Sequence, residues 1–512
     1  MAVQIITRQG RQVLGVQHLG SAHTDAELEV LVTMAEQQLS PGQGALDLGV
    51  LSRVPARMDA VANWTRSDGL DLGLGRGRPR QVAAGGRLVK TSSVLLWQVL
   101  AGVYTRLGFD VLADEAFRAM VLARIVEPTS KAEVVRVLGE IGAPCPSLRT
   151  LFRALGRCQA RDYRDRLAKA CLRHSATTAG FGALCLYDVT TLHFENETED
   201  DLRKVGMSKE HRVDPQVQVG LLVDPSGFPL EVHLFEGNRA ETKTLIPVLA
   251  AFQARHGITD MVVVADAGML SAANLNDLQD AGFAFIVGSR LTKAPYDLAE
   301  HFARHGDYFA DGQILESART MGTGKDARSR RIVYQYSFKR HKRDDRTINA
   351  QIAKADRIAA GQAPLKKTRF LKVSGATKSL DEATIARARQ LAGLKGYVTC
   401  LDQKQLSGAA VIAAYHDLWQ VEASFRMVKS DLRARPVFHH QREAIEAHLT
   451  VVFAALAVSR YLTTATGKSI RKIVRELRAV QTATIEINGQ QLDFPADTTP
   501  AAAQILSALT RH

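Results

Sequence analysis

The stretch that organises the rest of this chain is YHDLWQVEASFRMVKSDL, residues 415–432. If it forms one helix, four side chains spaced three or four residues apart share one face: Glu422, Phe425, Arg426 and Lys429. Tyr415 lies two turns earlier on the same side. A phenol, a carboxylate and two cations on one face would suit a nucleic-acid phosphate with its metal ion. A solvated amphipathic helix would show the same spacing, so this interpretation needs partners elsewhere in the chain.

The composition bounds the class of protein. The chain has 512 residues, of which 46% are hydrophobic and 23% charged, as in soluble globular proteins. Lys and Arg number 66 against 53 Asp and Glu, a formal charge of +13. This balance favours a polyanionic partner over an acidic small substrate. The length predicts about two to four domains.

Cysteine usage and hydropathy indicate the compartment. The five cysteines include no CxxC pair and no Cys/His cluster with zinc spacing, so neither a structural metal nor a disulfide framework is predicted. The N-terminus lacks an apolar core of signal-peptide length, and no run of about 18 uninterrupted apolar residues could span a bilayer. We expect a cytoplasmic protein with no membrane partner.

The N-terminal third divides into two parts. Residues 3–7 predict a short strand and residues 25–38 an acidic helix, followed by a Gly/Arg-rich linker over residues 72–87. From Ser92 to about Leu172 the apolar spacing is helical, which predicts a compact all-α domain.

Within this helical part, two segments fit a helix-turn-helix-like pair. They are residues 129–138 and 147–155, and the second carries Arg149 and Arg153 one turn apart. Ordinary surface arginines would look the same, so both interpretations stay open.

The periodicity changes from helix to strand at Phe181. GALCLYDVTTLHF, from Gly182, is an apolar β-rich run that places Asp188 at or near the end of a strand. MVVVADAGML, from Met261, is a wholly apolar strand that ends on Asp266, and such a run is typical of the centre of a sheet covered on both faces. Three further strands are predicted at residues 216–224, 229–238 and 283–289, with helices at about 241–256 and 271–282. The sequence therefore predicts a mixed α/β sheet of about five strands flanked by helices.

Residues 290–400 interrupt this unit. They contain β-like pieces and basic runs such as KRHKRDDR, from Lys339, interleaved with aromatic residues. That pattern suits contact with a nucleic-acid backbone, although a sheet edge protected by lysines would look similar. We interpret the stretch as an insertion, after which the helix around Glu422 completes the α/β unit. Residues 444–462 then predict a buried helix, and Asn488-Gly489 predicts a hairpin turn.

Three carboxylates thus stand at positions that a common site would use: Asp188 and Asp266 at strand ends and Glu422 on a helix. Phosphoryl transfer with two hard cations needs oxygen ligands that converge at one edge of a rigid sheet, with the ions about 3.5–4 Å apart. A lone aspartate at a strand end is more often a turn or cap residue, so the prediction depends on the three occurring together.

The order Asp, Asp, long insertion, Glu resembles the DDE transposases of bacterial insertion sequences. The motif Y-x2-L-x3-E-x6-K, formed by Tyr415, Leu418, Glu422 and Lys429, resembles the Tyr-Arg-Glu-Lys signature of the insertion sequence four group. YDVTTLHFE resembles the family's first aspartate motif and VVVADAGML its second. FEGNRAETKTL and PVFHHQREAIEAHL resemble the segments before the second aspartate and after the glutamate. The resemblance covers about residues 90–462.

This resemblance implies an RNase H-like core interrupted by a β-rich insertion, and an enzyme that cleaves and joins DNA. It implies that Asp188, Asp266 and Glu422 are catalytic ligands of two Mg²⁺ ions, with Mn²⁺ as a substitute. It also implies that Tyr415 and Lys429 contact phosphates of the transposon ends, outside the metal ligands. The partners implied are double-stranded DNA, as element ends and as target, and a second copy of the chain in a dimer on DNA. The family further implies a bacterial, nucleoid-associated location.

One departure from the signature matters, because its Arg position is Leu418, which cannot bind phosphate. We hypothesise that Arg426, one turn past the glutamate, takes this role. Some relatives form a DNA hairpin and hold a flipped base with aromatic residues; Trp419 and Phe425 are candidates, although packing residues of a buried helix would look the same.

Two alternatives remain open on the sequence. A metal-dependent nuclease or resolvase on the same fold would cut DNA without joining it. A non-catalytic DNA-binding relative would bind DNA whether or not Mg²⁺ is present. The domains predicted are 1–90 (N-terminal region and linker), 91–178 (helical, DNA-end-binding), 179–290 (catalytic core), 291–405 (insertion), 406–465 (core, second part) and 466–512 (C-terminal region).

Overall fold

The structure is a computed structural model. It describes residues 2–9, 12–21, 86–180, 184–195, 198–206, 214–240, 243–258, 261–266, 271–289, 298–306, 308–364, 366, 368–374 and 377–511. These fall into two compact units, residues 1–83 and 84–512. In the first unit, β1 (Ala2–Gln9) and β2 (Gln12–Ser21) pair as an antiparallel hairpin, which confirms the strand predicted at the N-terminus. The helix predicted at 25–38 lies outside the described residues, as does nearly all of the linker.

The second unit begins with the predicted helical region. Its helices are α3 (Val94–Arg106), α4 (Glu115–Val126), α5 (Lys131–Glu140), α6 (Leu148–Ala160) and α7 (Tyr163–Ser175), with a 3₁₀ turn, η1 (Phe109–Leu112), after α3 and a π-helical turn, η2 (Ala176–Gly180), after α7. Ser130 and Ser147 cap α5 and α6 through their hydroxyl groups, as residues at this position commonly do. The predicted pair of helices therefore exists, with Arg149 and Arg153 exposed on α6.

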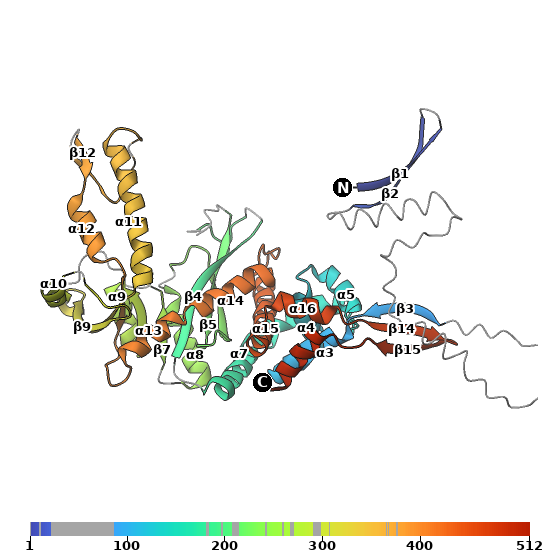
Figure 1. The fold of residues 1–512 in the computed structure, drawn as a ribbon. Coiled ribbons are helices and arrows are strands. Elements are labelled where there is room, and N and C mark those ends of the chain that lie inside the picture. The colour runs from blue at the N-terminus through green and yellow to red at the C-terminus, as the bar shows by residue number, and fades with distance from the viewer. Residues whose placement is uncertain are drawn as a thin grey trace, which may run out of the picture. The chain divides into compact units, whose positions relative to one another are not determined.

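An eight-stranded sheet follows, in the order β6-β5-β4-β7-β8-β13-β10-β9 (Figure 1). Its first five strands are β4 (Leu184–His193), β5 (Gln216–Val223), β6 (Pro229–Glu236), β7 (Val262–Ala265) and β8 (Ala284–Ser289). β4, β5 and β6 pair antiparallel, whereas β7 pairs parallel with β4 and β8 parallel with β7. Three antiparallel strands followed by two parallel ones on the other side of the first is the RNase H-like arrangement. The predicted five-strand mixed sheet is confirmed.

Helices cover the two faces of this sheet. Cys185, Val263 and Phe285 belong to a core on one face, together with residues of α8 (Leu245–His256) and α9 (Ala272–Asp280). Their neighbours in the strands, including Leu186 and Val264, belong to a larger core on the opposite face. Because successive strand residues point to opposite faces, neighbouring apolar residues of a strand contribute to opposite cores.

The insertion continues the sheet instead of standing apart from it. β9 (Ile314–Met321), β10 (Arg328–Tyr336) and β13 (Leu394–Thr399) add to its edge, with β13 antiparallel to β8. Around these strands lie α10 (Ala299–His305), η6 (Gly324–Asp326), α11 (Phe338–Ala359), the hairpin of β11 (Leu371–Ser374) and β12 (Thr377–Leu380), and α12 (Glu382–Gln390).

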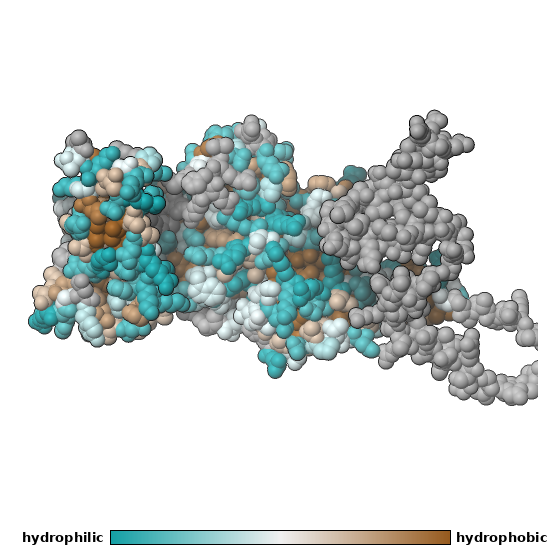
Figure 2. Space-filling view, turned by 45° about the horizontal axis from the view of Figure 1, so that its top comes forward, coloured by the Kyte–Doolittle hydropathy of each residue, from teal (hydrophilic) through white to brown (hydrophobic). Residues whose placement is uncertain are grey.

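The 22-residue helix α11 is the longest element of the insertion, and it was not predicted. Ile348, Ala355 and Ile358 recur along it at helical spacing and are buried, and the first two belong to a small core of the insertion. The density of charges around them hides this apolar periodicity in the sequence. On the face shown in Figure 2, the end that carries α11 and α12 is largely hydrophilic around one apolar patch.

The segment of residues 415–432 is not one helix. α13 (Gly408–His416) ends after Tyr415, α14 (Trp419–Arg426) follows, and a π-helical turn, η7 (Met427–Asp431), continues it. The prediction of a single continuous helix is therefore wrong, because the chain turns between the two helices where Leu418 anchors it in the core.

Among the remaining elements, the buried helix and the hairpin turn were predicted from the sequence, whereas β3 and α17 were not. α15 (Arg442–Thr466) is long and apolar enough to cross a membrane, yet 78% of its apolar window is buried inside the described part of the chain, as in a core helix. α16 (Ile470–Arg478) and α17 (Pro500–Arg511) pack nearby, and β14 (Thr482–Ile487) joins β15 (Gln490–Pro495) through the predicted Asn488-Gly489 turn. β14 also pairs with β3 (Arg87–Ser92) in a separate three-stranded sheet.

Candidate active site

Strand pairing places the two predicted aspartates side by side. The parallel ladder between β4 and β7 runs from Leu184↔Val262 to Leu186↔Val264. Asp188 and Asp266 each follow the last of these pairs by two residues. Both therefore lie at the carboxyl edge of adjacent parallel strands, Asp188 within β4 and Asp266 directly after β7, where a ladder continued in the same register would place their backbones about 5 Å apart. Asp188 lies within β4, which continues to His193 because β5 pairs with it there, so the expectation that the strand ends at or near Asp188 is wrong.

Both aspartates point to the same face of the sheet. Leu186 and Asp188 are two residues apart in β4, as are Val264 and Asp266 at the end of β7, and alternate residues share a face. Leu186 and Val264 are buried in the core that α13, α14 and α15 cover. Asp188 is half-buried, and its Oδ1 accepts a hydrogen bond of 2.8 Å from the amide of Val189, whereas Asp266 is exposed.

Glu422 is carried by a helix that packs on this face. α14 lies against β4 and β5, with Val421 and Phe425 buried beneath it and Glu422 exposed in its first turn. The Ser424 hydroxyl donates to the carbonyl of Gly227 over 3.0 Å and so ties the helix to the β5–β6 turn. The three carboxylates that the sequence singles out are thus supplied by two neighbouring strands and by the helix packed upon them.

These residues fit a divalent cation in their chemistry, since hard cations such as Mg²⁺ bind carboxylate oxygens. Two carboxylates stand side by side at one sheet edge, which is a suitable base for such a site. Among the described residues, no three His, Cys, Asp or Glu side chains lie close enough together to hold one ion. Glu422 therefore does not join the two aspartates in one cluster in this structure.

Tyr415 lies against the second aspartate. Its hydroxyl donates a hydrogen bond of 3.0 Å to Asp266 Oδ1, and the side chain is buried. Burial and the neighbouring Asp266 carboxylate raise the pKa of Tyr415, so that its hydroxyl stays protonated and can act as a donor. The predicted contact of Tyr415 with DNA phosphate stays a prediction.

One cation near Asp266, Lys395, was not predicted from the sequence. Lys395 on β13 places its ammonium 4.2 Å from the ring centre of Tyr415. Burial and the nearby Arg340 guanidinium lower the pKa of Lys395, and the Asp266 carboxylate opposes this effect. Lys395 is one residue from Gly396 in an ordinary-looking strand, and only the pairing of β13 with β8 reveals which face it occupies. Arg340, in contrast, belongs to the basic run that the sequence analysis noted.

The other predicted residues of the segment separate into surface and core. Arg426 is exposed at the end of α14, and Lys429 is half-buried in η7. Phe425 does not share their surface, because its side chain is buried. Leu418 is also buried in the apolar core, which explains why an arginine is absent from this position of the signature.

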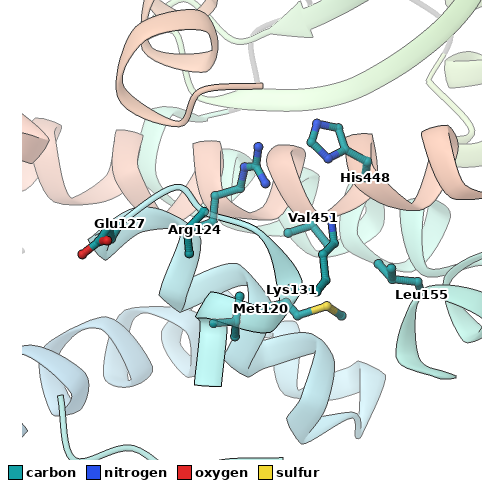
Figure 3. Close-up of a pocket in the computed structure, with 9 residues that line it drawn as sticks. Met120, Arg124, Glu127, Lys131, Leu155, His448 and Val451 are labelled. Atoms are coloured by element: carbon teal, nitrogen blue, oxygen red, sulfur yellow. The ribbon is translucent and has the colours of Figure 1, made fainter. Parts of the chain in front are cut away.

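A second network holds the chain just after Glu422's helix. Arg124 on α4 donates to the carbonyls of Leu432, over 3.0 Å, and Arg433, over 2.8 Å. The buried His448 on α15 donates from Nε2 to the carbonyl of Ala434 over 3.1 Å. Three successive carbonyls are thus bound by side chains of two other helices. In Figure 3 the Arg124 and His448 side chains extend from α4 and α15 toward one another.

Lys131 and His439 extend this network. The Lys131 ammonium donates to His439 Nε2 over 2.9 Å, which requires a neutral imidazole. Burial, Lys131 and Arg124 lower the pKa of His439 to about 4, and burial lowers the pKa of Lys131 to about 8. No sequence motif links these two positions, which lie far apart in the chain.

Comparison with known proteins identifies the family. A sequence model described as transposase DDE domain matches residues 180–458, just over half of the chain. The chain belongs to this DDE transposase family. The matched range contains Asp188, Asp266 and Glu422, and members of the family generally use divalent metal ions. No curated protein sequence matches the chain.

Among solved structures, the chain is similar to a piggyBac transposase in a synaptic complex with hairpin DNA, solved by cryo-EM. The TM-score is 0.38 and the sequence identity 8%, over 75% of this chain and 76% of that one. The family assignment rests on the sequence match, because a likeness of this size does not define a shared fold.

Proposed function

We propose that this DDE transposase mobilises an insertion sequence, binding the element's ends and catalysing metal-dependent DNA cleavage and strand transfer of the cut-and-paste type. The observation that supports this most directly is the level placement of Asp188 and Asp266 on β4 and β7, with the helix that carries Glu422 packed on the same face. The insertion sequence four group remains the branch that the Tyr415 to Lys429 motif resembles.

In this proposal each carboxylate has a defined task. Asp188 and Asp266 hold divalent cations at the strand edge, two Mg²⁺ ions or Mn²⁺ in their place, and Glu422 completes the ligand set from α14. Such ions supply an activated water or 3′-hydroxyl and stabilise the leaving oxygen. The sheet keeps the two aspartates in fixed register, which provides the positioning that phosphoryl transfer depends on.

DNA phosphates would contact cations on several elements around the site. Arg426 is exposed one turn after Glu422, and Lys429 lies close behind it in the chain. Arg149 and Arg153 are exposed on α6, where a second helix of a DNA-binding pair would present them. The substitution Arg426→Ala should weaken both end binding and cleavage, and unchanged values for both would remove Arg426 from the proposal.

The hairpin intermediate remains a separate hypothesis. Trp419 is 57% exposed and can stack on a base, whereas Phe425, at 6%, is a packing residue. Denaturing gels of cleaved element ends, which separate hairpin from open products, decide whether the intermediate forms.

The decisive experiment incubates the protein with the ends of its own element and Mg²⁺, beside Glu422→Gln and without metal. Cleavage and joining by the wild type alone support the proposal. Cutting without joining of a 3′-hydroxyl donor would indicate a nuclease or resolvase instead. DNA binding that ignores Mg²⁺ and Asp188→Ala, with no cleavage, would indicate a non-catalytic relative. Sizing the protein on paired ends tests the proposed homodimer.

A further inference from the structure

We infer that Tyr415 is a positioning residue for the Asp266 carboxylate and not a phosphate contact, an inference that rests on the proposed function. Its hydroxyl lies 3.0 Å from Asp266 Oδ1, on the side chain proposed to hold a metal ion. A phenol has a single hydrogen to donate. While it is directed at Asp266, the same hydrogen cannot bind a DNA phosphate.

The phenol is held in this place from several sides. Gly288 on β8 lies directly beneath the ring, since a Cβ atom there would stand 2.8 Å from Tyr415 Cζ and collide with the hydroxyl oxygen. The ring of Tyr397 packs edge-on against it, with the ring centres 5.0 Å apart. Only 7% of the surface of Tyr415 is exposed, so its side chain cannot turn toward solvent without losing its contacts with Gly288 and Tyr397.

The cation beside the phenol strengthens the assignment. Lys395 covers the ring of Tyr415, with its Nζ 4.2 Å from the ring centre, and is itself only half-buried. A DNA strand that approaches Asp266 therefore meets the ammonium group of Lys395, while the phenol of Tyr415 stays buried beneath it. The resemblance assigns a phosphate contact to Tyr415, but the geometry gives that side chain a buried acceptor.

A donor that binds a ligand carboxylate fixes its orientation and affects its affinity for metal. Removing such a donor typically weakens metal affinity or activity by about 10- to 100-fold. The two roles of Tyr415 therefore predict different losses. A positioning role predicts weaker metal binding with normal DNA binding, whereas a phosphate contact predicts weaker DNA binding with normal metal binding.

The test is the substitution Tyr415→Phe, which keeps the ring and removes only the hydroxyl. Mn²⁺ affinity is measured directly on the protein, with and without its DNA ends, by electron paramagnetic resonance of free Mn²⁺. End affinity is measured in Ca²⁺ by gel shift, and cleavage is followed over a range of Mg²⁺ concentrations. We expect Mn²⁺ affinity to fall by about 10- to 100-fold, end affinity to be unchanged, and cleavage to recover partly at high Mg²⁺.

Tyr397→Phe is the matched control. It removes a neighbouring phenol hydroxyl that lies 3.3 Å from His416 Nε2, and it should leave Mn²⁺ affinity unchanged. Gly288→Ala provides a second route, because its Cβ would displace the Tyr415 ring, and it should weaken Mn²⁺ binding in the same direction.

Unchanged Mn²⁺ affinity in Tyr415→Phe would overturn the inference, whether or not end affinity falls. If the wild type cleaves its ends and Asp266→Asn abolishes this, the proposed function stands even when the inference fails. If the wild type binds no Mn²⁺ with its ends present, the proposed function and the inference fail together.

Discussion

The two kinds of element that carry the candidate ligands are built in different ways. Asp188 and Asp266 sit on strands whose relative position is set by the backbone ladder between β4 and β7. Glu422 sits on an eight-residue helix whose position depends on side chains: buried Val421 and Phe425, the Ser424 hydroxyl and the network around Arg124.

This difference has a consequence for the site. A sheet register is fixed to a whole residue, so the aspartates are placed together without any ligand. The exposed side chain of Glu422 retains rotational freedom, and in this structure the three carboxylates do not form one cluster. We infer that the strands supply the fixed part of the site and α14 the part that adjusts when cations and DNA are present.

The largest effect tests whether both kinds of ligand are needed. Asp188→Asn, Asp266→Asn and Glu422→Gln should each reduce cleavage of element ends by at least about 1,000-fold, since each removes a charge from the proposed metal ligands. Glu443→Gln, on an exposed carboxylate in the first turn of α15, is the matched control and should cleave normally. If Glu422→Gln retained more than about a tenth of the activity, the strand pair alone would be the site.

The second prediction concerns Leu418, which stands where the signature has arginine. It tests whether this buried side chain anchors the start of α14. Leu418→Arg places a cation where the side chain is only 7% exposed in an apolar core, and should lower the free energy of unfolding by about 3–5 kcal/mol. Chemical denaturation measures this loss. Adding an arginine at exposed Ala413 on the preceding helix should be nearly neutral. A stable Leu418→Arg protein with tighter end binding would show that this position can still contact DNA.

The next prediction concerns the hydrogen bonds at the end of η7. They test whether α4 and α15 hold α14, the adjustable part of the site, in place. Arg124→Met removes the hydrogen bonds of a half-buried cation to Leu432 and Arg433, and should lower the free energy of unfolding by about 2–4 kcal/mol. Hydrogen exchange should quicken in residues 427–437 and stay unchanged in β4 and β7. Arg149→Met, on an exposed surface of α6, should change stability by less than about 0.5 kcal/mol. If hydrogen exchange quickened equally in β4 and β7, the strands would not be the fixed part of the site and α14 would not be the adjustable one.

The histidines of this network give a smaller, pH-dependent effect. His439 has its pKa lowered to about 4 in the folded protein, so the unfolded chain binds more protons below about pH 6.5. Stability conferred by the neutral imidazole is therefore present above that pH and is lost as pH falls toward 4. Allowing for partial solvent exposure, His439 should account for about 1 kcal/mol of the loss between pH 7 and pH 5. Denaturation curves at both pH values should show that His439→Gln loses less unfolding free energy between pH 7 and pH 5 than the wild type does. An equal loss in the two proteins would contradict this assignment.

The same division explains what the sequence can predict. The strands around Asp188 and Asp266 follow from apolar alternation and length, and their common edge follows from parallel pairing. Glu422 could be joined to them only through its spacing from Tyr415 and Lys429 and through the family resemblance. The break between α13 and α14 was missed because Asp417 and Leu418 carry no strong helix-ending signal, such as Gly or Pro.

Individual side-chain contacts between distant segments could not be predicted from the sequence. The bond from Tyr415 to Asp266 depends on Gly288 leaving room for the ring, and the ammonium of Lys395 reaches it from another strand. Each of these residues is unremarkable within its own segment. Their meaning comes from the order of strands in the sheet, which single-sequence periodicity does not contain.

A hairpin remote in sequence from the site gives the smallest effect and isolates what the backbone alone determines. Asn488 and Gly489 both have positive φ angles, of 52° and 78°, as a two-residue turn between β14 and β15 requires. Gly489→Ala should therefore lower the free energy of unfolding by about 1 kcal/mol, since alanine disfavours this conformation. Gly139→Ala, within helix α5 and with nothing within 4 Å of the added carbon, should instead raise stability by about 0.5–1 kcal/mol. Stability changes of opposite sign for the two variants in thermal melts would show that single residues encode the local backbone geometry. Changes of the same sign would show that packing dominates even at an exposed turn.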